Sequence, residues 1–257
     1  MNSIGLAYTL LAAANSASAL TVPPPALACL TRHYPVTAAQ EGNVWYLVLP
    51  NGVRVPFDDQ KRKSLEERLA FPDVNDVFEQ RYTPGPIAPV TGEDQDPGRI
   101  RLTPLLDAIY GNAAANKDLV SIDFFGTTLR VHKATRSPFA KARSALRAAV
   151  TKEPALLRTL RRLSGAYNWR LIAGTNRVSA HAYGIAIDLD AKLGDYWRWR
   201  GAKGWRNRIP QPVVDAFESA GFIWGGRWSH YDTMHFEYRP ELLDKSCWAD
   251  AALQTTQ

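Results

Sequence analysis

The chain has 257 residues, enough for one large domain or two small ones, and its 46% hydrophobic content with eight tryptophans excludes a largely disordered protein. The net charge of +6 at pH 7 favours anionic surroundings. The basic residues are scattered, however, and no nucleic-acid-binding motif occurs, so we expect no nucleic-acid partner.

The N-terminal segment has the features of a secretory signal peptide. Residues Ile4 to Ala14 are almost all apolar, and Ala17-Ser18-Ala19 offers the small residues that signal peptidases cut after. We therefore expect a signal peptide at 1–19 and a periplasmic or secreted protein. A Lys or Arg before the apolar run is missing, and a buried N-terminal helix is the alternative. The run is too short to span a bilayer permanently, so we expect no stable membrane insertion.

The chain has two cysteines, Cys29 and Cys247, near opposite ends of the sequence. In an exported protein such a pair most simply forms a disulfide, and we predict that it is oxidised. A lipid anchor on Cys29 is disfavoured because Ala26 stands where such sites have a large aliphatic residue. A zinc site built from the cysteines is disfavoured because each lacks a second nearby ligand.

The first predicted element is a β-hairpin within residues 43–56. Apolar strand formers at 44–49 and 53–55 flank Asn51-Gly52, a strong hairpin signal. Residues 58–100 are rich in Asp, Pro and Gly, so we expect little regular structure there.

Further along the chain, Ser137-Pro138 marks a helix start, because a capping Ser precedes Pro in the first turn. This helix is predicted to run to about residue 164, with a break near Pro154. The other predicted elements are a helix at 105–115, a hairpin at 121–131 turning at Gly126-Thr127, strands at 170–173 and 185–190, a helix at 212–220 closed by Gly221, and a strand at 234–239.

The residues that suggest chemistry lie in the last third of the chain. Along the predicted strand 185–190 side chains alternate between faces, and the large apolar ones share the face expected to be buried. Asp188 faces the other way beside the small Ala186, which leaves room for a metal. His181, across the turn at Gly184, can approach the same point.

The predicted strand 234–239 is amphipathic in the same way. Its polar face, formed by His235, Glu237 and Arg239, is hard to explain by packing. If this strand lies near the first, His235 completes a set of two histidines and one carboxylate with His181 and Asp188. Such a set leaves a fourth zinc position open, which is typical of catalytic rather than structural sites.

A catalytic zinc site needs a carboxylate that takes a proton from water and passes it to the leaving amine. Asp232 and Glu237 both compete for this role. Glu237 shares the face of His235 and is well placed to hold its imidazole, whereas Asp232 lies outside the strand and could lean over the open position. His230 is expected to line the substrate cleft.

Together, the pattern Ser-x-His-x-x-Gly-x-Ala-x-Asp at 179–188 and the pattern Asp-x-x-His-Phe-Glu at 232–237 resemble those of the VanY-type zinc D-alanyl-D-alanine carboxypeptidase family. That family also includes the related L-alanyl-D-glutamate endopeptidases. The resemblance covers roughly residues 140–240. It implies a zinc cofactor and a peptidoglycan peptide as substrate.

Carried onto this sequence, the resemblance implies zinc ligands at His181, Asp188 and His235. It makes Asp232 the general base; many members have Glu there, and the Asp resembles the endopeptidase branch. It also implies that Arg177 stabilises the developing oxyanion or binds a substrate carboxylate, and that Ser179 contacts substrate. The family's usual Ser-Gly-Tyr-Arg reads Gly-Thr-Asn-Arg here, with a compressed spacing to Ser179.

We therefore expect an α+β fold of the hedgehog/DD-peptidase type, with a small antiparallel sheet that carries zinc and packs against helices. We expect an N-terminal extension or accessory lobe at 20–135 and a zinc peptidase domain at 136–257. The predicted function is hydrolysis of peptidoglycan stem peptides, with the bond left open between a terminal D-alanine and the L-alanyl-D-glutamate link. The alternative is a non-catalytic zinc domain that binds peptide or cell wall. The sequence does not indicate the oligomeric state.

Overall fold

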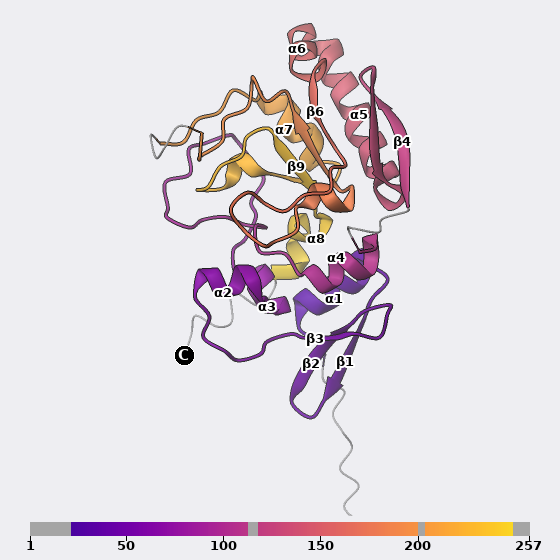
Figure 1. The fold of residues 1–257 in the computed structure, drawn as a ribbon, viewed down its shortest axis with the longest axis vertical. Helices are drawn as coiled ribbons and strands as arrows, with labels where there is room; N and C mark the ends of the chain where they lie inside the picture. The colour runs from indigo at the N-terminus through magenta and orange to yellow at the C-terminus, as the bar shows by residue number, and fades with distance from the viewer. Residues whose placement is uncertain (1–21, 113–117, 200–203, 249–257) are drawn as a thin grey trace, which may run out of the picture.

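The computed structural model describes residues 22–112, 118–199 and 204–248. The signal peptide predicted at 1–19 lies outside these residues. Figure 1 shows an elongated molecule, with the N-terminal elements at its lower end and the hairpin and long helix of the middle of the chain at its upper end. Within the described ranges, no helix is both long enough and apolar enough to cross a membrane.

The lower end contains a three-stranded antiparallel sheet, formed by β1 (Thr37–Glu41), β2 (Val44–Val48) and β3 (Arg54–Pro56) in that order. The predicted hairpin is the β2–β3 pair, and Gly52 in its turn has a φ of 81°, a conformation that glycine adopts without strain. β1 was not predicted from the sequence, because its Ala, Gln and Glu residues have little strand propensity.

Four helices accompany this sheet: α1 (Pro25–His33), α2 (Leu65–Ala70), α3 (Val74–Phe78) and α4 (Thr103–Tyr110). Helices α2 and α3 correct the expectation of little regular structure across 58–100. Each begins with a capping box, Ser64 with Glu67 and Asp73 with Asp76. The reciprocal hydrogen bonds of this motif start a helix even in a polar segment.

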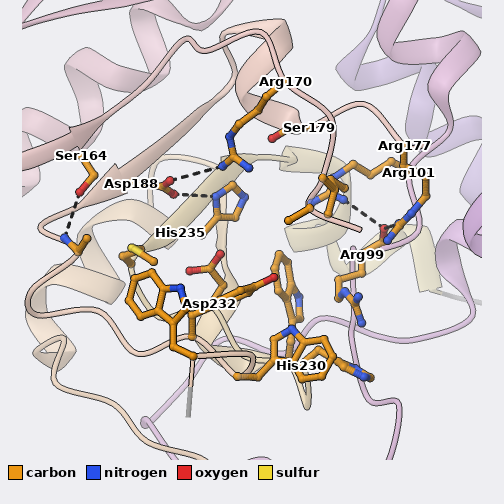
Figure 2. A pocket seen from close by; sticks show the side chains of 18 residues that line it. Arg99, Arg101, Ser164, Arg170, Arg177, Ser179, Asp188, His230, Asp232 and His235 are labelled. Carbon is orange, nitrogen blue, oxygen red and sulfur yellow. Dashed lines mark hydrogen bonds and ion pairs between the residues drawn. The ribbon is translucent and has the colours of Figure 1, made fainter. Parts of the chain in front are cut away.

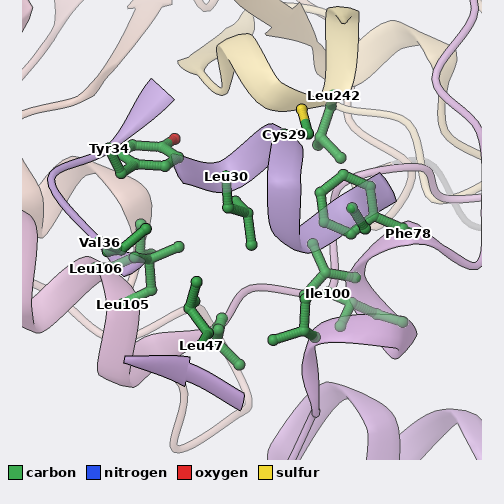
Figure 3. Close-up of a cluster of buried hydrophobic side chains, with 14 of the residues drawn as sticks. Cys29, Leu30, Tyr34, Val36, Leu47, Phe78, Ile100, Leu105, Leu106 and Leu242 are labelled. Carbon is green, nitrogen blue, oxygen red and sulfur yellow. The ribbon is translucent and has the colours of Figure 1, made fainter. Parts of the chain in front are cut away.

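The buried side chains of α1, α3, α4 and the three-stranded sheet form one hydrophobic cluster, called here the first core (Figure 3). It brings together Leu30 of α1, Leu47 of β2 and Leu106 of α4, all almost fully buried. Leu242, from near the end of the chain, joins them. Helix α4 confirms the helix predicted at 105–115 up to Tyr110, but the helix ends there, because Gly111 has a φ of 79°.

The predicted disulfide is present in the structure. Cys29 of α1 is bonded to Cys247 in the 3-10 helix η6 (Lys245–Trp248), 218 residues later. Phe78 of α3 packs edge to face on Trp248 in the same 3-10 helix. The C-terminal part of the chain is therefore fastened onto the first core.

The middle of the chain forms, in order, β4 (Leu119–Phe124), β5 (Thr127–His132), α5 (Arg136–Lys152), the 3-10 helix η3 (Pro154–Leu156), α6 (Leu157–Leu160) and β6 (Leu163–Gly165). The β4–β5 hairpin and its turn at Gly126 are as predicted, and so is the helix break at Pro154. The predicted helix end at residue 164 is wrong, because the chain is already paired there as a strand.

A four-stranded antiparallel sheet follows, with β6, β7 (Ala186–Leu189), β9 (His235–Tyr238) and β8 (Phe222–Trp224) in spatial order. Helix α7 (Gln211–Glu218) confirms the helix predicted at 212–220, and α8 (Pro240–Leu243) follows β9. β7 and β9 confirm two predicted strands. The strand predicted at 170–173 is wrong: the Ile172 N–H bonds to the Arg177 carbonyl, so the segment folds back on itself.

One face of this sheet packs on a second hydrophobic core, in which Ile187 of β7 and Phe236 of β9 are fully buried. Phe217 of α7 stacks on Phe236 with ring centroids 4.2 Å apart. On the polar face, Asp188 lies directly opposite His235 in the register of β7 and β9. The predicted alternation of faces is confirmed, and the architecture is a mixture of helices and antiparallel sheets, an α+β fold.

The two cores do not follow the order of the chain. The β4–β5 hairpin contributes Phe124 and Leu129 to the second core, whereas α8 contributes Leu242 to the first core. The predicted division into a lobe at 20–135 and a domain at 136–257 stays a prediction.

Candidate metal centre

Three of the predicted site residues converge on the polar face of the four-stranded sheet. His181 lies in the 3-10 helix η4 (Ala180–Tyr183), Asp188 in β7 and His235 in β9. Asp188 Oδ1 lies 3.1 Å from His181 Nε2 and 3.0 Å from His235 Nδ1. The two histidine nitrogens are 3.1 Å apart. Figure 2 shows Asp188 joined to His235 at the back of a pocket.

The turn between η4 and β7 depends on Gly184. Its φ is 69°, and a Cβ at this position would lie 2.7 Å from the backbone nitrogen of His132. That same nitrogen donates a hydrogen bond to the Gly184 carbonyl. Because only glycine fits both conditions, the chain can reverse sharply and bring His181 over Asp188.

The second nitrogen of each histidine lies against an acceptor. His181 Nδ1 is 2.5 Å from the carbonyl oxygen of Ala166, and His235 Nε2 is 3.1 Å from Glu237 Oε2. A proton donated to each acceptor leaves His181 Nε2 and His235 Nδ1 unprotonated. This arrangement is typical of histidines that bind a metal.

The facing atoms are then two nitrogen lone pairs and a carboxylate oxygen, which repel one another unless a cation or a proton lies between them. Burial alone would lower the pKa of His235, but its hydrogen bonds to Asp188 and Glu237 and their charges raise it to about 10. The pocket therefore favours positive charge at this point. Tetrahedral zinc with bonds of about 2.0–2.1 Å would hold ligand atoms about 3.3 Å apart, close to the separations found. The residues fit a zinc ion.

Glu237 lies behind His235 and is fully buried. Besides His235, it accepts hydrogen bonds from the guanidinium groups of Arg101 and Arg239. Burial alone would raise the pKa of Glu237, but the charge of Arg101 and the hydrogen bonds from His235 and Arg101 hold it well below its usual range. Glu237 is thus an ionised acceptor that orients His235, as expected from the strand face that the two residues share.

Asp232 precedes β9 and lines the same pocket as Asp188 and His235. Its Oδ1 is buried and has no hydrogen-bond partner among the residues that the structure describes. Burial first, and then the negative charge of Asp188, raise the pKa of Asp232 to about 7, while His235 and Arg170 act in the opposite direction. Such a carboxyl group is suited to accept and release a proton near neutral pH.

The pocket in front of these residues has a volume of about 360 Å³ (Figure 2). Cationic and aromatic side chains are prominent in its walls. They include Arg99, Arg101, Arg170, Arg177, Tyr196, Trp197, Trp199 and Trp228. The pocket is therefore suited to a ligand that carries negative charge.

Arg177 stands in the pocket wall on the same side as Arg99 and Arg101 (Figure 2). No carboxylate of the described residues forms an ion pair with it, and its Nη1 donates a long hydrogen bond of 3.5 Å to the Arg99 carbonyl. Burial, followed by the charges of Arg101, Arg99 and Arg198, lowers the pKa of Arg177 to about 10. An anionic ligand would relieve this repulsion.

Ser179 also lines the pocket, but its hydroxyl has a local partner. It caps η4 by accepting a hydrogen bond from the His181 N–H at 3.4 Å. His230 lines the pocket as predicted, and its Nδ1 lies 2.7 Å from Asp96 Oδ2. Trp197 packs edge to face on the His230 ring.

Sequence reasoning missed the pocket residues Arg99 and Arg101, and it missed Asp96, which contacts His230. These residues lie 78 to 83 positions before Ser179, where the first motif begins, in a segment with no periodic pattern. Charged residues in a Pro- and Gly-containing loop are ordinary surface features. No local signal therefore distinguishes them from a solvated loop.

A family model described as D-alanyl-D-alanine carboxypeptidase matches residues 173–238. The matched stretch contains the three converging residues together with Asp232 and Glu237, and it ends before Arg239. No curated protein and no solved structure matches the chain. The match supports a peptidase that acts on peptidoglycan-type substrates.

Proposed function

We propose that this protein is a zinc-dependent peptidase that hydrolyses the stem peptides of peptidoglycan, with zinc held by His181, Asp188 and His235. The observation that carries the proposal is the convergence of His181 Nε2, Asp188 Oδ1 and His235 Nδ1 within 3.0–3.1 Å of one another. Their set of two nitrogens and one oxygen leaves a further ligand position open, as in catalytic zinc sites.

The chemistry that zinc supplies in such a site is polarisation of the scissile carbonyl and acidification of a water molecule. Asp232 takes the proton from the attacking water and returns it to the nitrogen of the leaving group. Its buried Oδ1 and its pKa of about 7 suit both steps. A purely structural zinc site needs no such carboxyl group, so Asp232 favours an enzyme over a zinc-containing binding domain.

Arg177 donates hydrogen bonds to negative charge on the substrate. This charge is either the oxygen of the attacked carbonyl or a carboxylate next to the scissile bond. Both candidate bonds, a terminal D-alanyl-D-alanine bond and an L-alanyl-D-glutamate bond, release a residue with a free carboxylate in an unamidated stem. The cationic wall formed with Arg99 and Arg101 supports this orientation. We further propose that the protein acts outside the cytoplasm, where both the disulfide and the substrate occur.

The test is digestion of purified muropeptides by the zinc-loaded protein, followed by mass spectrometry. Loss of one alanine from pentapeptide stems identifies a carboxypeptidase of the VanY type. Release of the peptide that begins with D-glutamate identifies an endopeptidase. If every stem peptide keeps its mass, although the protein binds one equivalent of zinc, the peptidase proposal is wrong.

A further inference from the structure

Residues Gln95–Arg101, called here the 95–101 strap, join the first core to the candidate metal centre. Three backbone carbonyls of the strap accept hydrogen bonds from the segment 228–239, which carries Asp232 and His235. The pairs are Gln95 with the Ser229 N–H, Pro97 with the Trp228 side chain and Gly98 with the Arg239 side chain. The strap lies outside the stretch that matches the family model.

Arg101 ends the strap and holds Glu237 through a fork of hydrogen bonds. Its Nε lies 3.0 Å from Oε1 and 3.1 Å from Oε2, and its Nη2 lies 2.5 Å from Oε2. The Arg101 side chain is 11% exposed and that of Glu237 is 0% exposed. Arg239 reaches the other carboxylate oxygen at 3.3 Å.

The two oxygens of Glu237 have different surroundings. Oε2 accepts hydrogen bonds from both Arg101 and His235, so the Arg101 fork determines where the acceptor of His235 lies. Without Arg101, Oε2 is held by the imidazole alone, and the carboxylate keeps only the 3.3 Å contact from Arg239 on Oε1, so carboxylate and ring are held less firmly. A ligand ring held less firmly presents its Nδ1 lone pair less accurately toward Asp188 and His181.

We propose that Arg101 is a positioning residue of the metal centre, which acts through Glu237 to fix the orientation of His235. The N-terminal part of the chain then completes a site whose three ligands all come from the C-terminal part. This inference rests on the proposed function, because it requires that His235 bind zinc.

A different role for Arg101 would be simply to hold two parts of the chain together. The molecule contains a matched ion pair with that role: Arg227 Nε lies 2.7 Å from Glu218 Oε1, with side chains 13% and 6% exposed. Arg227 also binds the carbonyl of Gly85, so it too joins the N-terminal part to the C-terminal part. Neither partner contacts a proposed ligand. Arg227→Met is therefore the control for Arg101→Met.

The experiment measures zinc affinity by competition with a chromophoric chelator, and the free energy of unfolding in denaturant. Arg101→Met and Glu237→Gln are each expected to weaken zinc binding about 10- to 100-fold. The double variant is expected to bind zinc no more weakly than Glu237→Gln alone, because Arg101 acts through Glu237. Arg227→Met is expected to lose stability and keep its zinc affinity. Zinc affinity is the chosen readout because Arg101 also lines the pocket, where a change in activity could have another cause.

A folded Arg101→Met protein with the zinc affinity of the wild type overturns the inference. If Arg101→Met does not fold, Arg101→Lys decides, because a single ammonium group keeps the charge but cannot form the fork. A shifted visible spectrum of the cobalt-substituted Arg101→Lys protein, with weaker zinc binding, is expected. A spectrum and affinity equal to the wild type would overturn the inference. A wild-type protein that binds no zinc contradicts the proposed function instead, so the two failures are distinguishable.

Discussion

Each proposed ligand depends on a neighbour that fixes its protonation state or its position. His181 uses a backbone carbonyl as its acceptor, whereas His235 uses the side chain of Glu237. Asp188 opposes His235 in the strand register, so the backbone sets its position. Asp232 differs from all three because its Oδ1 is buried without a partner in the described part of the chain. Asp232 is the residue whose replacement separates catalysis from metal binding most cleanly.

Asp232→Asn is expected to lower the turnover of muropeptides about 100- to 10,000-fold, because the amide cannot accept the proton of the attacking water. The amide has nearly the same shape, and Asp232 is not one of the three proposed ligands. We therefore expect bound zinc to stay at one equivalent, measured by atomic emission after dialysis. A variant that keeps its turnover would remove Asp232 from the mechanism.

The same substitution should change how the stability of the zinc-free protein depends on pH. The pKa of Asp232 is raised to about 7 in the folded state. The folded protein therefore holds this proton more tightly than the unfolded chain does. The resulting stabilisation is complete below the ordinary pKa of an Asp and is lost as the pH rises through about 7.

In Asp232→Asn this loss disappears. Relative to wild type, the variant should gain about 1–4 kcal/mol in free energy of unfolding between pH 4 and pH 8, measured by urea titration with a chelator present. If the difference in free energy of unfolding between the two proteins does not change with pH, the raised pKa of Asp232 is contradicted. Adding zinc should reduce the effect, because a nearby cation favours the ionised carboxylate.

Among the secondary-structure elements, strong local patterns were predictable, and short strands were predictable only beside a turn signal, as for β3 after Asn51-Gly52. β7 and β9 have alternating polarity, which the sequence shows directly, and their pairing brings Asp188 opposite His235. β6 and β8 have three residues each, too few for a periodic signal. The segment 170–173 has strand-forming residues but turns back at Ile172. Strand propensity alone could not reveal that turn.

The residues of the candidate site, too, were predictable from the sequence only in part. The two motifs are local in the sequence, so they predict the three converging residues, Asp232 and Glu237. Arg101 and Asp96 approach the pocket only because the chain folds back over a long distance, and no pattern near them signals this. Tertiary contacts of this kind cannot be predicted from the local sequence.

Gly184 connects the element that carries His181 to the strand that carries Asp188. Gly184→Ala should cost about 1–2 kcal/mol from the left-handed backbone alone, and more because the new methyl group would meet the His132 backbone. Gly126→Ala is the matched control, since Gly126 has a φ of 83° and open space around it. We expect Gly184→Ala to be the less stable variant in denaturant and to bind zinc more weakly. Equal losses of stability, with unchanged zinc binding, would show that this turn does not shape the centre.

Across the whole molecule, contacts between residues far apart in the sequence join the first core, the four-stranded sheet and the second core. The disulfide fastens α1 to η6, and the 95–101 strap connects the first core to the pocket. The disulfide and the strap thus each join described parts of the chain that are far apart in the sequence.

Reduction of the disulfide is expected to lower the free energy of unfolding by about 2–5 kcal/mol, because the unfolded chain is released from a very long loop. The measurement is denaturant unfolding with and without a phosphine reductant. The double variant Cys29→Ser with Cys247→Ser is the control and should not respond to the reductant. A wild-type protein whose unfolding is the same in both conditions would show that the bond contributes no stability.

The 95–101 strap has a consequence for how its sequence can vary. It binds the pocket segment largely through backbone carbonyls, which any residue supplies. Side chains are required at Asp96, which holds His230, and at Arg101. Gly98 has a φ of 90°, and a Cβ there would lie 2.4 Å from Ile223. Ile100 is buried in the first core, and Arg99 lines the pocket. Randomising all seven positions and selecting for zinc-dependent hydrolysis should therefore recover Asp96, Gly98 and Arg101, favour apolar residues at position 100 and cationic residues at position 99, and tolerate wide variation at Gln95 and Pro97.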